Sequence, residues 1–243
     1  GAAEHVKKNN SSLHIIGLVS QGNVHSYIDH LYAILDFAKN EGLKNVFIHA
    51  FTDGRDSPPQ DSLQFYEKIK NKLEKEYPFA KIVDLIGRHF ALDRDNNWDR
   101  IKKTYELLTE SKGEVYNDIS AAIKSDYDKN LTDESIEPKV IDPPAGGEPI
   151  KNNDAVVFLN FREDSARQLT KAFVLEDFNP PVGGFERKKI DNLYFVTMTR
   201  YDKDLPTHVL FETLTIDNSL AKLISDANRL QIHIAETEKY AHV

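Results

Sequence analysis

Two carboxylates and an arginine surround a glycine in the segment Asp53-Gly54-Arg55-Asp56. A carboxylate beside a guanidinium can accept a proton from a substrate hydroxyl and return it, which makes Asp56 the candidate acid/base residue. Asp53 is better suited to holding the loop through its backbone amides. An isolated Asp-Gly pair is most often a plain turn. The functional interpretation therefore depends on which other polar groups meet this loop.

Basic side chains or a histidine follow four apolar segments that are typical of buried strands. His25 follows the first segment and Arg55 the second. Arg88 and Arg162 follow the third and fourth, and Arg94 lies in the same loop as Arg88. Parallel strands bring their carboxyl ends to one edge of a sheet, where ligands of α/β proteins bind. Because guanidinium forks match phosphate and carboxylate oxygens, the recurrence predicts a site for a small, multiply charged anion such as a phosphorylated organic acid.

The elements that must position these side chains alternate along the chain. Apolar runs predict strands over residues 13–19, 45–51, 81–86, 155–158, 193–197 and 231–234. Helical spacing of apolar residues predicts intervening helices, the first of them capped by Ser26 and a short one over 115–125. Residues 4–12 are polar and aperiodic, and we expect a lead-in segment there. This order is typical of an α/β fold, a three-layer αβα domain with a mainly parallel sheet.

Composition excludes several classes of function. The net charge of −8 argues against a general nucleic-acid partner. No apolar run approaches the roughly 20 residues that span a bilayer, so we expect no membrane partner. The chain has no cysteine, which excludes thiolate metal sites and suits a cytoplasmic protein. No nucleotide-binding glycine loop, metal-ligand pattern or convincing nucleophile is present, and we expect no cofactor in this chain.

Six motifs, in order and at matching spacing, resemble those of cofactor-independent phosphoglycerate mutases. They are LVS with VHS (18–20 and 24–26), HAFTDGRD (49–56), GR with DRD (87–88 and 93–95), NFR (160–162), TMTRYD (197–202) and AETEKYAHV (235–243). The resemblance runs from about residue 5 to residue 243. Any one motif would be weak, but together they are specific.

The resemblance implies an enzyme of glycolysis and gluconeogenesis, in the alkaline phosphatase superfamily, that interconverts 3-phosphoglycerate and 2-phosphoglycerate through a phosphoserine. In this family a transferase domain grips the glycerate, and a phosphatase domain carries the nucleophilic serine and two manganese ions. The resemblance assigns residues 1–12 to a linker, 13–213 to the transferase domain and 214–243 to a return segment of the phosphatase domain. It implies that the serine and metal ligands lie outside these 243 residues.

The family's substrate contacts carry over by position, with Asp56 as the proton acceptor from the glycerate hydroxyl. The matching residues are His25, Arg55, Asp56, Arg88, Arg94, Arg162 and Lys239. Two positions depart from the family pattern. Ser165 stands where a second arginine is common, with Arg167 two residues on, and Gln21 stands where an aspartate is usual. Both departures concern substrate affinity more than identity.

The sequence leaves other functions open. A stand-alone module that binds phosphorylated acids, relaxed in specificity by the missing arginine, is the main alternative. A self-sufficient metal-dependent hydrolase using Asp53 and Asp56 would need histidine ligands that the spacing does not offer. If the mutase interpretation holds, we expect the isolated chain to be a monomer without mutase turnover, and its partner to be the phosphatase domain of the same polypeptide.

Overall fold

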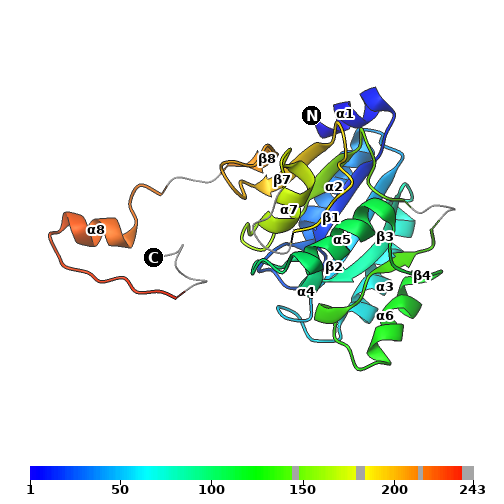
Figure 1. Cartoon of the computed structure of the whole chain (residues 1–243), viewed down its shortest axis with the longest axis horizontal. Coiled ribbons are helices and arrows are strands. Elements are labelled where there is room, and N and C mark those ends of the chain that lie inside the picture. Colours follow the sequence, from blue (N-terminus) through cyan, green and yellow to red (C-terminus); the bar gives the residue numbers. More distant parts are fainter. Residues whose placement is uncertain (144–147, 179–183, 213–215, 237–243) are drawn as a thin grey trace. The chain divides into compact units, whose positions relative to one another are not determined.

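An eight-stranded sheet runs through the computed structural model, which describes residues 1–143, 148–178, 184–212 and 216–236 (Figure 1). Its strands lie in the order β4-β5-β3-β2-β1-β6-β7-β8. Their bounds are β1 Leu13–Leu18, β2 Val46–Thr52, β3 Ala80–Gly87, β4 Glu114–Tyr116, β5 Lys139–Ile141, β6 Ala155–Phe158, β7 Tyr194–Thr199 and β8 His208–Phe211. Neighbouring strands pair in parallel except β3 and β5, which are antiparallel.

Helices cover both faces of this sheet, so the molecule has three layers (Figure 1). One buried apolar cluster joins the sheet to α1 Ala2–Asn9, α2 Ile28–Asn40, α3 Ser62–Glu76 and α6 Ile119–Tyr127. A second cluster on the other face involves α4 Arg88–Ala91, α5 Trp98–Glu110 and α7 Arg167–Val174. Alternate residues of one strand serve the two clusters: Ile15 belongs to the first and Ile16 to the second. The predicted α/β class with a mainly parallel sheet is confirmed.

The chain divides into two compact units, Gly1–Glu212 and Thr213–Val243. The first holds the whole sheet and all the core residues described above. The second contains α8 Leu220–Asp226. Ser219 is its N-cap residue, and the Ser219 hydroxyl accepts from the Lys222 amide at 3.2 Å. None of the residues of α8 is buried.

Several expectations about single elements are wrong. Residues 4–12 are not a plain lead-in, because α1 occupies most of them and buries Ala3 and Val6 against the first cluster. Ser26 does not cap α2, since its hydroxyl donates to the Leu18 carbonyl instead, and Tyr27 is the N-cap residue. No strand forms over 231–234 in the described residues, where Ile232 and Ile234 are exposed.

The region after α5 also differs from its predicted form. Residues 114–116 form β4, and α6 starts later than the predicted helix because the Asp118 carboxylate accepts from the amides of Ser120 and Ala121. The strands β5 and β8 and the short helix α4 were not predicted. Each of these three has only three or four residues, too few to show a period.

Candidate functional site

The loop after β2 is organised by Asp53, which is 1% exposed. One carboxylate oxygen accepts from the amides of Arg55 and Asp56 at 3.2 and 3.0 Å, and the other accepts from the Ser20 hydroxyl at 2.7 Å. Burial works to raise the pKa of Asp53, but these hydrogen bonds and the Arg88 guanidinium outweigh it and lower the pKa. Asp53 is therefore an ionised support for the loop.

Arg88 joins three of the strand-end loops. Its Nη1 donates to Asp53 Oδ1 at 2.7 Å and to Asp56 Oδ2 at 2.6 Å, and its Nη2 donates to His25 Nε2 at 2.9 Å. Only 7% of Arg88 is exposed. Burial acts to lower the pKa of Arg88, but Asp56 and Asp53 outweigh this and raise it. The guanidinium is thus permanently charged between two carboxylates.

The protonation of His25 follows from this contact. An arginine can only donate, so Nε2 of His25 must be the acceptor and the ring proton must lie on Nδ1. Burial, followed by the positive charge of Arg88, lowers the pKa of His25 to about 4. Its Nδ1 is buried and has no hydrogen-bond partner among the described residues. His25 is therefore neutral at pH 7 and offers one donor.

A second group forms around Asp164, which the sequence had not singled out. Arg94 Nη1 donates to Asp164 Oδ2 at 2.7 Å, and Arg162 donates to the same oxygen from Nε at 3.0 Å. The two groups of side chains adjoin each other at His25, whose carbonyl oxygen accepts from the amides of Phe161 and Arg162 at 2.8 and 3.3 Å. The ends of β1, β2, β3 and β6 thus contribute to one region of the sheet edge.

Arg55 lies outside these two groups. The Arg55 side chain is 62% exposed and forms an ion pair with Glu134, with 3.2 Å between Nε and Oε1. Lys239 lies outside the described residues. Gln21 donates from its side chain to the carboxylate of Asp61. Glu134 is a further residue that sequence reasoning missed, because nothing local marks its pairing with Arg55.

The 3₁₀ turn η1 Asp133–Ser135 supports the loops after β2 and β3. Asp133 Oδ2 accepts from the amides of Asp61 and Ser62 at 2.9 Å each, so it caps α3 from outside that helix. Its carbonyl accepts from the Thr52 hydroxyl at 2.6 Å. The turn also packs tightly on Gly87, where an added Cβ would lie 2.3 Å from the Glu134 carbonyl oxygen. Only glycine fits there without moving the turn.

The family departures at the end of β6 have clear contacts. Ser165 is 3% exposed, and its amide and hydroxyl face Asp164 Oδ1 at 2.8 and 3.4 Å. Arg167 donates from Nε to the Tyr201 carbonyl at 2.7 Å and pairs with Glu163 at 3.5 Å. Neither contact is with Asp164, which accepts from Arg94 and Arg162.

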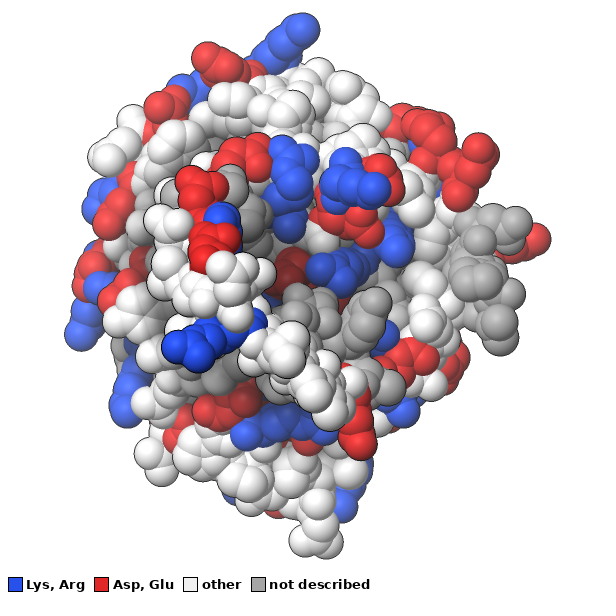
Figure 2. Space-filling view, turned by 90° about the vertical axis from the view of Figure 1, so that its left-hand side faces the viewer, with Lys and Arg blue, Asp and Glu red and all other residues white. Residues whose placement is uncertain are grey.

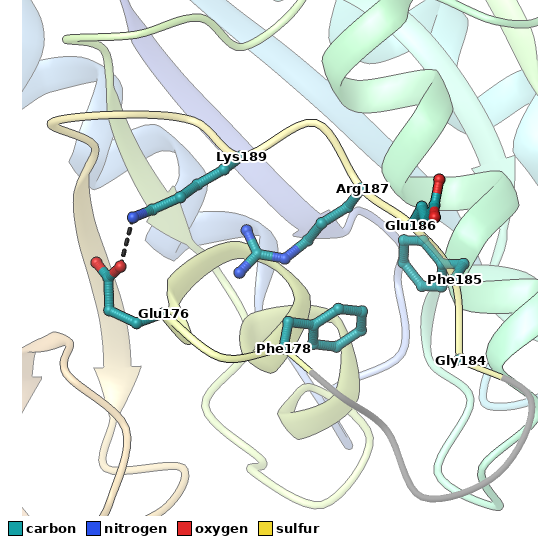
Figure 3. A pocket seen from close by; sticks show the side chains of 7 residues that line it. All are labelled: Glu176, Phe178, Gly184, Phe185, Glu186, Arg187 and Lys189. Carbon is teal, nitrogen blue, oxygen red and sulfur yellow. Dashed lines mark hydrogen bonds and ion pairs between the residues drawn. The ribbon is translucent and has the colours of Figure 1, made fainter.

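Other features of the molecule lie apart from these side chains. Acidic and basic residues are interspersed over the face in Figure 2 rather than separated by sign. A pocket of about 650 Å³ is lined by residues of the segment after α7 (Figure 3). In it, the Arg187 guanidinium lies over the Phe178 ring and Lys189 pairs with Glu176. It contains none of the predicted site residues. Within the described ranges, no cluster of three or more His, Asp and Glu side chains could hold a metal ion, and no helix has the length and apolarity to cross a membrane.

The comparisons with known proteins agree with the motif order. The family model described as BPG-independent PGAM N-terminus matches residues 1–203. The 2,3-bisphosphoglycerate-independent phosphoglycerate mutases of Methanosarcina acetivorans and Clostridium beijerinckii are 46% and 45% identical to the chain over its whole length. The chain spans about half of these relatives, 47% and 46% of their lengths.

The structural comparison leads to the same family. A crystal structure of Leishmania mexicana phosphoglycerate mutase superimposes with a TM-score of 0.81 at 30% identity, over 93% of this chain and 43% of that one. The chain therefore belongs to the family of the N-terminal part of 2,3-bisphosphoglycerate-independent phosphoglycerate mutases.

Proposed function

We propose that this chain is the substrate-binding half of a phosphoglycerate mutase, which binds 3-phosphoglycerate and 2-phosphoglycerate at the edge formed by β1, β2, β3 and β6. The observation that carries the proposal is that Arg88 contacts the His25 ring, while the amide of Arg162 donates to the His25 carbonyl. The Arg162 side chain shares the Asp164 carboxylate with Arg94. Arginines from distant parts of the chain gather where a parallel sheet binds ligands. Their fixed charges suit the carboxylate and phosphate of a phosphoglycerate.

Asp56 is the proposed proton acceptor from the glycerate hydroxyl. Of the two carboxylates in its loop, Asp53 is fully engaged with amides, a hydroxyl and Arg88. The Asp56 side chain is 22% exposed, and one of its oxygens accepts from Arg88. Asp56 therefore keeps an oxygen that can face a substrate while Arg88 stabilises its charge. His25 lies beside this carboxylate, with 3.6 Å between its Nε2 and Asp56 Oδ2, and would contact the substrate as a neutral ring.

The remaining parts of the reaction are assigned to the other half of the full-length protein. That half would contain the serine that forms the phosphoserine and the two manganese ions, which activate the phosphoryl group when bound. Residues 214–243, with Lys239, are proposed to belong with it, and we expect the protein to be cytoplasmic and monomeric. The role of residues 13–213 is then to bind and orient the glycerate.

The test is calorimetric titration of 3-phosphoglycerate into the 243-residue chain and its Arg55→Ala variant. Arg55 is proposed to exchange its ion pair with Glu134 for a contact with the bound anion. Its side chain is 62% exposed, so this variant should fold normally. We expect saturable binding that weakens at least 10-fold in Arg55→Ala, because one charge-assisted contact to the anion is lost. Inorganic phosphate serves as the ligand control.

Arg200→Ala is the matched control variant, because Arg200 is also an exposed arginine at a strand end and pairs with Glu212. It should bind as the wild type does. Equal loss in both variants would mean that general charge attracts the ligand, and would contradict the proposed site. Equal affinity for diverse phosphorylated acids would instead favour the binding-module alternative.

A further inference from the structure

A single carboxylate oxygen holds two arginines that come from separate parts of the chain. Asp164 Oδ2 accepts from Arg94 Nη1 at 2.7 Å, and Arg162 Nε and Nη2 lie 3.0 and 2.9 Å from it. Arg94 precedes Asp164 by 70 residues and reaches it from the loop beyond α4. The three side chains are between 25% and 28% exposed, so they are partly shielded but open to a ligand.

The Asp164 carboxylate is itself fixed in orientation. Its second oxygen accepts from the Ser165 amide at 2.8 Å, and the Ser165 hydroxyl lies 3.4 Å away. Burial works to raise the pKa of Asp164, but the Ser165 amide and the charges of Arg162 and Arg94 outweigh it and lower the pKa. The carboxylate therefore stays ionised at neutral pH and cannot turn freely.

Two guanidinium groups that approach one anion repel each other, and long side chains lose entropy when they are held. A fixed carboxylate between them offsets both costs before the ligand arrives. We infer that Asp164 is a positioning residue, which holds Arg94 and Arg162 in the arrangement that receives the anionic substrate. This inference rests on the proposed function, because it names how part of the proposed site is arranged.

The first measurement is of the arginine side chains themselves, without ligand. Nitrogen-15 NMR of Nε–H groups should show the Arg162 Nε proton protected from solvent exchange in the wild type. In Asp164→Asn, which keeps the side-chain shape but removes the charge, this protection should fall at least 10-fold. Glu163→Gln is the matched control, because Glu163 is adjacent but pairs with Arg167. It should leave the Arg162 signal unchanged.

The second measurement is 3-phosphoglycerate binding by the same three proteins, with circular dichroism to confirm that each is folded. Asp164→Asn should bind at least 10-fold more weakly, and Glu163→Gln within about 2-fold of the wild type. If Asp164→Asn binds as well as the wild type or more tightly, the inference is overturned, because Asp164 then does not help the arginines to bind the ligand or competes with it for them. Unchanged Arg162 protection in Asp164→Asn would overturn it as well.

The two arms separate this inference from the proposed function. If the wild type binds no phosphoglycerate, the proposed substrate is contradicted, and the NMR arm alone decides whether Asp164 holds the arginines. If the wild type binds and Asp164→Asn behaves like it in both arms, the proposed function stands and the role of Asp164 is refuted.

Discussion

At the scale of single residues, the site is defined by which donor faces which acceptor. Arg88 donates to two carboxylates and to His25, and this sets the tautomer of the imidazole. A lysine could not make these three contacts in one plane, since its ammonium group lacks the rigid fork. The neutral state of His25 is thus a consequence of its partner and its burial, and it should be visible in the pH dependence of stability.

We predict that His25 makes the protein less stable as the pH falls from about 6.5 to about 4. The pKa of His25 is about 4 in the folded state and about 6.5 for a histidine in an unfolded chain, so the unfolded chain binds a proton that the native state does not. The contribution of neutral His25 to the free energy of unfolding is complete above pH 6.5 and is lost toward pH 4. Over this range the free energy of unfolding falls by at most about 1.4 kcal/mol per pH unit. The measurement is urea denaturation of wild type and His25→Asn between pH 4 and 8.

Asparagine keeps an acceptor for Arg88 but does not titrate. The free energy of unfolding of His25→Asn should therefore fall less steeply with decreasing pH, by the contribution of one proton. His14, whose pKa burial lowers to about 4, acts in the same direction and is present in both proteins. Above pH 7 the difference between the two proteins should be constant. Parallel curves over the whole pH range would show that folding does not lower the pKa of His25.

At the scale of elements, η1 contacts the ends of the two strands that precede Asp56 and Arg88. It joins the end of β2 through Thr52 and packs on Gly87 at the end of β3. The sheet alone would place these strand ends near one another, but not their loops. The short turn supplies the hydrogen bonds that fix both, so its contact with Gly87 should matter for stability.

We predict that Gly87→Ala destabilises the protein by about 2–3 kcal/mol in urea denaturation, because overpacking against a backbone atom cannot relax cheaply. The backbone of Gly87 has φ −68°, which alanine adopts without strain. The obstacles are therefore the Glu134 carbonyl oxygen and the Ile136 amide nitrogen, which would lie 2.3 and 2.7 Å from an added Cβ.

Gly42→Ala is the informative comparison. Gly42 has φ +68° and nothing within 4 Å of an added Cβ, so only conformational strain opposes alanine, at about 1 kcal/mol. Asparagine at 42, which tolerates this conformation, should recover part of that loss. A neutral Gly87→Ala variant would show that η1 yields easily and does not fix the loops.

At the scale of the whole molecule, the buried core and the proposed anion site both lie in Gly1–Glu212. This unit holds the two apolar clusters and the groups around Arg88 and Asp164. The described part of Thr213–Val243 exposes large apolar side chains. They are Ile216, Leu220, Leu223, Leu230, Ile232 and Ile234. Such exposure is typical of a surface that another domain covers, which agrees with the proposed return segment.

We predict that a chain ending at Glu212 unfolds in urea within about 0.5 kcal/mol of the full 243 residues, since no core residue is removed. A chain ending at Pro206 should be clearly less stable, because β7 loses its pairing with β8 from Val196 to Thr199. If the free energy of unfolding of the chain ending at Glu212 were several kcal/mol below that of the 243-residue chain, residues 213–243 would contribute to the stability of the first unit.

Much of the fold could be predicted because buried strands and helices have recognisable patterns of apolar residues in the sequence. The continuous apolar runs of β1, β2 and β6 mark strands covered on both faces, and their order with the helices implies a parallel sheet. The edge where His25, Arg88 and Arg162 meet follows from that sheet alone. Short elements such as β5 and β8 could not be predicted, because three or four residues are too few to show a periodic pattern. Whether a strand runs parallel or antiparallel depends on the neighbouring strand with which it pairs.

The sequence by itself determined the residue types, their places at strand ends and the family motifs. Only the tertiary structure decided the charged partners. They are Asp53 and Asp56 for Arg88, Glu134 for Arg55, and Asp164 for Arg94 and Arg162. The physical reason is that periodicity reports which side of an element is buried. Side-chain pairing between distant segments depends on strand register and loop path, and neither leaves a local signal in the sequence.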